Sequence, residues 1–168
     1  MVIIITVYEK GVIAVGIDLN LPILYKCSSF RYFGKQEFHV TRFCKENVLV
    51  MVTDGVLRFS ENDEDYEVKA GEYFIQRKNC RQSAAYASDE PKYLYVHFDA
   101  EWTDGNGSLA RRGTFDIEKV ANLMQSIGET SFEGRSYTEE QYLLLKLLQR
   151  QPPSLLPVLQ YKLCLSLQ

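Results

Sequence analysis

Residues that build metal centres and disulfide frameworks are scarce in this sequence. It contains two histidines and four cysteines in 168 residues, and no two cysteines form a CxxC pair. Widely separated cysteines are typical of reduced thiols in the cytosol, and they argue against a metal knuckle or a secreted disulfide framework. We therefore expect a cytoplasmic protein with free thiols. The cysteines are Cys27, Cys44, Cys80 and Cys164.

An excess of basic charge is also missing. The net charge is −3, and lysines and arginines are scattered apart from the pairs Arg77-Lys78 and Arg111-Arg112. Proteins that bind a phosphate backbone concentrate positive charge on one surface. The chain is therefore not expected to bind DNA by itself.

Long apolar runs are absent as well. Residues 1–7, MVIIITV, are followed closely by Glu9 and Lys10. This stretch is too short to span a bilayer, and it lacks the basic start of a signal peptide. Its β-branched residues favour a strand instead, so we expect no membrane partner.

Short β-rich runs separated by turn signals fill residues 1–100, at the spacing of an all-β sandwich or barrel. Thr53-Asp54-Gly55 and Glu61-Asn62-Asp63 each predict a hairpin turn, and Ala70-Gly71 allows a positive φ. These signals predict a mainly β fold, α+β overall, with a closed or nearly closed barrel. The expected strands are 2–7, 12–17, 22–26, 36–42, 48–53, 56–60, 64–69, 72–77 and 92–99.

Helical spacing begins after a Gly- and Asn-rich loop at residues 103–113. The first predicted helix has Thr114 or Asp116 as its N-cap and stops at Gly128. One face of this helix is apolar, which predicts packing on the barrel. The face consists of Ile117, Val120, Leu123, Met124 and Ile127.

A second helix is predicted from Thr138, which forms a capping-box pattern with Gln141, to Pro152-Pro153. Its apolar side chains cover more of the circumference than one flank of a barrel needs. We assign Leu144 and Leu148 to the fold and Leu143 and Leu147 to a homodimer interface. The alternative is a helix buried between the barrel and the C-terminal tail.

Three motifs in order carry a family resemblance: VLVMVTDG at 48–55, YEVKAGEYFI at 66–75 and KYLYVHF at 92–98. Together they resemble the cupin-type sensor domain of AraC-family transcription regulators. The resemblance implies a cupin-like β-barrel, a double-stranded β-helix or jelly roll, followed by two helices. It implies a barrel that binds an effector over residues 1–104, a helical dimerisation part over 105–151, and a linker over 152–168. DNA binding would then belong to a C-terminal helix-turn-helix domain beyond these residues.

Metal-binding cupins place their ligands at four positions that correspond here, counting from Gly55 and Gly71, to Arg42, Cys44, Val48 and Gln82. None of these is a histidine or glutamate. Tight binding of a catalytic metal needs several such ligands converging on one point. The sequence therefore predicts no metal, no cofactor and no enzymatic activity.

Arg42 is the informative substitution in a barrel of this kind. Its guanidinium offers a planar fork of donors that fits a carboxylate, a phosphate or a polyol, and in sugar-sensing members of the resembled family an arginine at the start of this strand contacts the effector. The alternative is a structural arginine at the rim, paired with Glu37 or Glu46.

Residues 92–98 alternate, so that Tyr93, Tyr95 and His97 share one face. Such a face can stack on a sugar-like ring and supply hydrogen bonds. We expect a small polar effector, sugar-like or anionic. The candidate ligand-binding residues are Arg42, Cys44, Gln82, Tyr93, Tyr95 and His97.

Other interpretations of the aromatic face stay open. His97 can be a hydrogen-bonded core residue. A metal-independent isomerase or epimerase would use His97 as the base and Tyr95 as the acid. A stand-alone carbohydrate-binding module is a further alternative.

Overall fold

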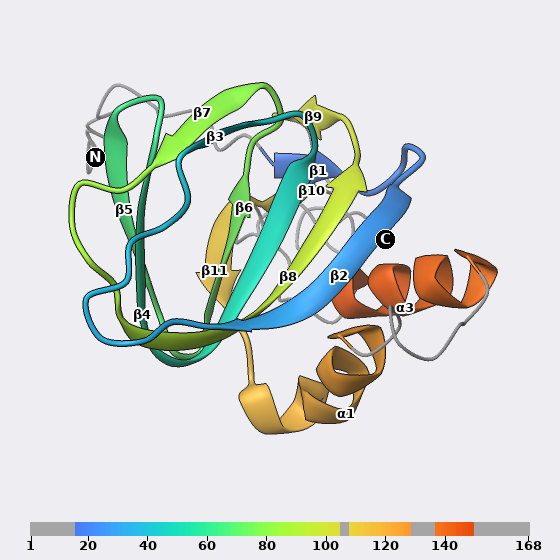
Figure 1. Cartoon of the computed structure of the whole chain (residues 1–168). Coiled ribbons are helices and arrows are strands. Elements are labelled where there is room, and N and C mark those ends of the chain that lie inside the picture. The colour runs from blue at the N-terminus through green and yellow to red at the C-terminus, as the bar shows by residue number, and fades with distance from the viewer. Residues whose placement is uncertain (1–15, 105–107, 129–136, 150–168) are drawn as a thin grey trace, which may run out of the picture.

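The computed structural model describes residues 16–104, 108–128 and 137–149, and this part of the chain is mainly β with two helices (Figure 1). The elements are β1 (Gly16–Asp18), β2 (Leu24–Tyr32), β3 (Arg42–Cys44), β4 (Asn47–Glu61), β5 (Glu64–Lys69), β6 (Glu72–Gln76), β7 (Cys80–Ser83), β8 (Asp89–Asp99), β9 (Trp102–Thr103), β10 (Ser108–Ala110), β11 (Arg112–Thr114), α1 (Ile117–Gly128) and α3 (Tyr137–Gln149).

Strand β4 organises the large sheet, because it pairs antiparallel with β5, β6, β7 and β8. Strand β2 extends this sheet beyond β8, β11 pairs with β6, and β3 pairs with β7. A separate small sheet has the order β10-β1-β9. No described helix is long and apolar enough to cross a bilayer.

The hairpin predicted at Thr53-Asp54-Gly55 is wrong. Residues 48–53 and 56–60 belong to one strand, β4, which runs through Gly55 with a φ of 68°. The register against β8 shifts on both sides of Asp54. A Cβ at Gly55 would lie 2.3 Å from the carbonyl oxygen of Asp89. The glycine therefore serves a bulge that lets two strands approach closely, and not a chain reversal.

Other turn and strand predictions can be compared directly. The turn after Glu61 is confirmed, since Asn62 and Asp63 both have positive φ, and Gly71 has a φ of 81°. The strand expected at 36–42 is wrong, because only Arg42 of that range is in a strand and Gln36 has a φ of 58°. Strand β7 and strands β9–β11 were not predicted. Residues 2–7 and 12–15 lie outside the described part.

The large sheet separates two apolar clusters, and strand β8 shows why. Leu94, Val96 and Phe98 are fully buried against the helices. Tyr93 points to the opposite face and packs in the second cluster, with Tyr95 at its edge. The predicted alternation of this strand is confirmed, and it places the polar aromatic side chains on the face away from the helices.

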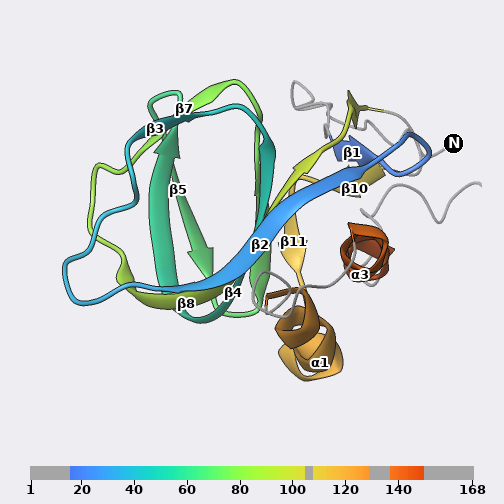
Figure 2. The same ribbon diagram turned by 45° about the vertical axis from the view of Figure 1, so that its right-hand side comes forward.

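Both helices lie on the side of the β2–β8 pair that faces away from β3, β5 and β7 (Figure 2). The Asp116 carboxylate accepts a hydrogen bond from the backbone N–H of Lys119 at 3.2 Å, which confirms Asp116 as a cap of α1. The predicted apolar face of α1 is buried apart from the half-buried Ile117; the buried residues are Val120, Leu123, Met124 and Ile127.

Helix α3 corrects two predictions. Gln141 does not complete a capping box, because its side chain accepts the N–H of Tyr25 at 2.8 Å and donates to the carbonyl of Ile23. These bonds tie the helix to β2. Leu147 was assigned to a dimer interface, but it is 0% exposed and belongs to the core together with Leu144 and Leu148. Leu143 is half-buried against the same core.

Candidate functional site

A cavity of about 360 Å³, lined by both polar and apolar side chains, lies on the face of the large sheet opposite the helices. We call it the central cavity. Four of the predicted ligand-binding residues line it: Arg42 from β3 and Tyr93, Tyr95 and His97 from β8. The other lining residues are Cys27, Arg31, Phe33, His39, Val40, Val48, Val50 and Gln76.

The remaining two predicted residues, Cys44 and Gln82, are buried but do not line this cavity. Gln82 lies directly across the β3–β7 pair from Arg42, and its Oε1 accepts a hydrogen bond from Arg42 Nε at 2.8 Å. The Cys44 thiol donates to the backbone carbonyl of Glu46 at 3.3 Å. Gln82 therefore positions Arg42 instead of contacting a ligand itself.

Arg42 does not form an ion pair with Glu37 or Glu46, which was the alternative interpretation of this residue. Glu37 binds Arg31 at 3.0 Å, and the Glu46 carboxylate lies beside His97. Within the described ranges, Arg42 has no carboxylate partner. Its fork thus remains available at the wall of the central cavity.

His39 and Gln76 are buried polar residues that line the cavity, and the sequence did not point to either as a site residue. His39 Nδ1 lies 3.0 Å from the carbonyl oxygen of Val40, and Gln76 Nε2 lies 3.4 Å from His39 Nε2. These partners assign the proton to Nδ1. Gln76 Oε1 has no hydrogen-bond partner among the described residues. A buried acceptor without a partner is costly, so Gln76 offers this oxygen to a ligand hydroxyl or to water. The sequence feature that could have identified Gln76 is its position: a polar glutamine directly follows the apolar residues 73–75 of a predicted strand.

The buried imidazole of His39 predicts an acid-sensitive fold. Burial lowers the pKa of His39 from 6.5 to about 4. The unfolded chain takes up the proton as the pH falls through 6.5, whereas the folded chain stays neutral until about pH 4, so stability is lost across this window. Between pH 7 and pH 5, wild type should lose about 2 kcal/mol more than His39→Gln in urea unfolding. Parallel pH profiles for the two proteins would contradict this expectation.

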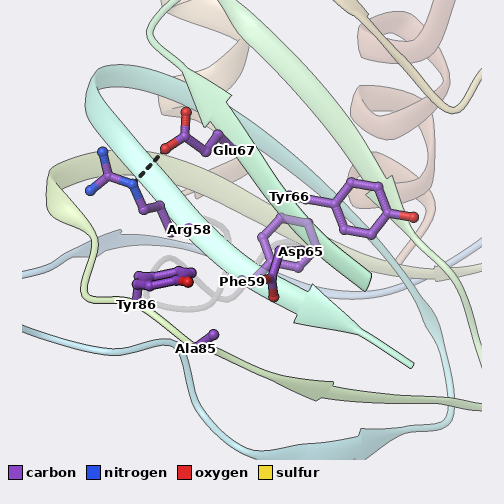
Figure 3. A pocket seen from close by; sticks show the side chains of 7 residues that line it. All are labelled: Arg58, Phe59, Asp65, Tyr66, Glu67, Ala85 and Tyr86. Carbon is purple, nitrogen blue, oxygen red and sulfur yellow. Dashed lines mark hydrogen bonds and ion pairs between the residues drawn. The ribbon is translucent and has the colours of Figure 1, made fainter. Parts of the chain in front are cut away.

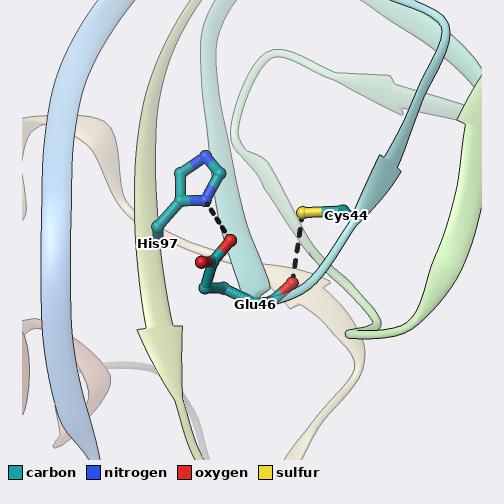
Figure 4. A group of neighbouring side chains, drawn as sticks. All are labelled: Cys44, Glu46 and His97. Carbon is teal, nitrogen blue, oxygen red and sulfur yellow. Dashed lines mark hydrogen bonds and ion pairs between the residues drawn. The ribbon is translucent and has the colours of Figure 1, made fainter.

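His97 has a carboxylate neighbour that the sequence did not reveal. Glu46 Oε2 lies 3.5 Å from His97 Nδ1 (Figure 4). The ring of His97 meets that of Tyr95 edge to face at a centroid distance of 5.7 Å. Burial, together with the charge of Arg42, lowers the pKa of His97. A neutral, oriented imidazole therefore faces the cavity at neutral pH.

A second, larger cavity of about 500 Å³ lies between the β4–β5 hairpin and residues 85–86 (Figure 3). Two charged side chains that line this cavity form an ion pair with each other: Arg58 Nε lies 2.7 Å from Glu67 Oε1. Phe59 and Tyr66 stack on each other at 5.5 Å. Because these groups satisfy one another, the central cavity is the better candidate for a ligand site.

No family model matches this chain. Over 80 residues, 45% of its length, the chain is 34% identical to the uncharacterized HTH-type transcriptional regulator YisR of Bacillus subtilis (strain 168). The matched segment covers 28% of that protein, so the chain corresponds to less than a third of its relative.

Solved structures give weaker likenesses. ToxT from Vibrio cholerae O395, bound to (E)-4-(8-methylnaphthalen-1-yl)but-3-enoic acid, has a TM-score of 0.44 and 12% identity, over 74% of this chain and 55% of that one. The SPY1581 protein of unknown function from Streptococcus pyogenes has a TM-score of 0.36 and 13% identity, over 45% of this chain and 74% of that one. Both TM-scores lie below 0.5, so neither likeness establishes a shared fold.

Proposed function

We propose that this chain is the effector-sensing part of a cytoplasmic transcription regulator of the AraC type, with a cupin-like barrel that holds a small polar ligand and has no enzymatic activity. The observation that carries the proposal is the central cavity, where Arg42 meets the polar aromatic face of β8. The match to a segment of an HTH-type regulator supports the regulatory role. DNA contacts would belong to a separate helix-turn-helix domain.

The groups around the cavity favour an anionic or polyhydroxylated effector. Arg42 lines it without a carboxylate partner among the described residues, whereas Arg31 is paired with Glu37. The buried His39 is uncharged at neutral pH, so it contributes hydrogen bonding and no charge. A guanidinium held by Gln82 can bind a carboxylate or phosphate with little loss of side-chain entropy. Tyr93 and Tyr95 add flat surfaces for a ring, and Gln76 adds an acceptor for a hydroxyl.

A ligand panel tests this proposal. Sugars, sugar phosphates and small carboxylic acids are added to chelator-treated protein, and the thermal unfolding midpoint is measured. At least one class should raise the midpoint, since a ligand that binds only the folded state stabilises it. Arg42→Ala should abolish this shift, because the fork supplies the main polar contact.

Arg58→Ala is the matched control, since it removes an arginine from the larger cavity and should leave the shift intact. Arg42→Lys should show little of the ligand-induced shift in the thermal midpoint, because an ammonium cannot reproduce the bidentate geometry of a guanidinium. A panel without any hit, or a hit that Arg42→Ala leaves unchanged, would rule out this binding mode.

Effector binding would act by shifting the population between two arrangements of the sensor and its linker. We propose that the regulator works as a homodimer, and that the exposed side of α3 contributes to the contact. Tyr142 and Leu145 are exposed there, and light scattering of the wild-type chain would show the dimer.

A metal-independent isomerase or epimerase is the second candidate, and one observation favours it. Glu46 lies beside His97 as a group that could orient a catalytic imidazole, with Tyr95 at the same wall. Turnover of any panel ligand that His97→Gln abolishes would support this function over sensing.

A further inference from the structure

Three side chains that can ligate a transition metal meet beside the central cavity. The Cys44 Sγ, a carboxylate oxygen of Glu46 and a ring nitrogen of His97 all lie within 4.8 Å of one another (Figure 4). Cys44 ends β3, Glu46 lies in the turn before β4, and His97 comes from β8. The fold thus brings together three different ligand types from separate elements.

The spacing suits a tetrahedral ion. Zinc binds nitrogen and oxygen at about 2.0–2.2 Å and sulfur at about 2.3 Å, so its ligand atoms lie roughly 3.3–3.8 Å apart. His97 Nδ1 and Glu46 Oε2 are already 3.5 Å apart. The Cys44 Sγ lies within 4.8 Å of both atoms, so a movement of the thiol by at most about 1.4 Å would complete the set.

Charge and burial also fit a divalent cation. A thiolate and a carboxylate would balance the two positive charges, and the site is partly shielded, with the His97 side chain 13% and the Glu46 side chain 38% exposed. Arg42 is the nearby opposing charge, and its Nε donates a hydrogen bond to Gln82 Oε1 at 2.8 Å. Binding would displace the thiol proton of Cys44 to solvent, one proton for each ion bound.

We propose that Cys44, Glu46 and His97 form a site for Zn²⁺ or a similar borderline-soft cation, with its fourth position open to solvent or to an oxygen of the cavity ligand. Of these three residues, only Cys44 stands at one of the four positions that correspond to the ligands of metal-binding cupins. The absence of histidine and glutamate from those four positions therefore does not argue against a metal at this cluster. The site does not depend on the proposed effector, and it would make the sensor responsive to a metal.

Cobalt titration of the reduced, chelator-treated chain tests the site without any organic ligand. One Co²⁺ per chain should bind and give a thiolate-to-cobalt charge-transfer band, which Zn²⁺ then removes by displacement. Cys44→Ser should abolish the band. Glu46→Gln and His97→Gln should each weaken Zn²⁺ binding by at least about tenfold, since even outer-shell changes at metal sites cost 10–100-fold.

Cys80→Ser is the matched control, because Cys80 is also buried and lies directly across from Cys44 in the β3–β7 pair. It should keep both the band and the affinity. Glu46 lies in a partly exposed turn, so Glu46→Gln should keep the fold and its thermal midpoint. The proposal is overturned if Co²⁺ does not bind stoichiometrically, if the band persists in Cys44→Ser, or if folded Cys80→Ser loses it.

Cys27 tests the open fourth position. It lies directly across from His97 in the β2–β8 pair and also lines the cavity. Unchanged Co²⁺ binding in Cys27→Ser supports a position filled by solvent or effector. Loss of the ion in that variant would mean that Cys27 is a fourth protein ligand and that the site is closed.

Discussion

Replacement of Arg111 by methionine is expected to lower the free energy of unfolding by about 3–5 kcal/mol at pH 7, because it leaves a buried carboxylate without its partner. The Arg111 guanidinium donates to Glu61 Oε1, and the two side chains are only 18% and 4% exposed. Arg111 also stacks on the ring of Phe74 at 4.6 Å and donates to the Tyr66 hydroxyl at 3.2 Å.

The pair is costly to break without being strongly stabilising as a whole. Burial raises the pKa of Glu61 above its usual value in spite of the attraction of Arg111 and the hydrogen bond from the N–H of Arg77. Desolvation therefore outweighs the ion pair, as is common for buried charges. Since the folded pKa is raised, the contribution of Glu61 to stability is complete below pH 4.5 and is lost as the pH rises through the folded pKa.

Urea unfolding at two pH values and one double variant check this account. The loss caused by Arg111→Met should be smaller at pH 5 than at pH 7, because protonation removes the unpaired charge. Glu61→Gln combined with Arg111→Met should recover much of the loss, since the amide still accepts the N–H of Arg77. A loss below about 1 kcal/mol, or an equal loss at both pH values, would contradict the expectation.

Leu147→Ala should lower the free energy of unfolding by about 2–5 kcal/mol, because it opens a cavity in the core between α3 and the sheet. Leu147 is 0% exposed, whereas Leu145 on the same helix is 37% exposed. Leu145→Ala is therefore the matched control and should cost less than about 1 kcal/mol.

The same pair of variants separates a core residue from an interface residue. A core leucine shifts the urea midpoint at every protein concentration. An interface leucine makes the midpoint depend on concentration and changes the mass seen by light scattering. If Leu147→Ala left the stability of the monomer unchanged, the placement of Leu147 in the core would be wrong.

The sequence predicted the structure correctly where a feature depends only on residues within one strand or helix. The alternation of residues 93–98 correctly separated Tyr93 from Leu94, because successive side chains of a strand must point to opposite faces. Asp116 and the apolar face of α1 were predictable for a similar reason, since a cap and a 3.6-residue period involve only near neighbours.

Where one sequence pattern is compatible with two different local structures, the sequence could not decide between them. A positive φ at Gly55 serves a hairpin turn and a bulge equally well, and the pairing of β4 with β8 decides between them. The leucines of α3 occupy most of its circumference, so the rotation of the helix depends on Gln141 binding the backbone of β2. That rotation buries Leu147.

Local sequence patterns were sufficient to predict the mainly β character of the chain, the helices that follow the strands, and Tyr93, Tyr95 and His97 at the central cavity, because each depends on a local period. Arg42 was predicted from the family resemblance. Which groups meet depends on the three-dimensional structure. It brought Glu46 to His97, Gln82 to Arg42 and Glu61 to Arg111. The physical reason is that these contacts join residues far apart in the chain, and their distances follow from sheet register and packing, which no local pattern encodes.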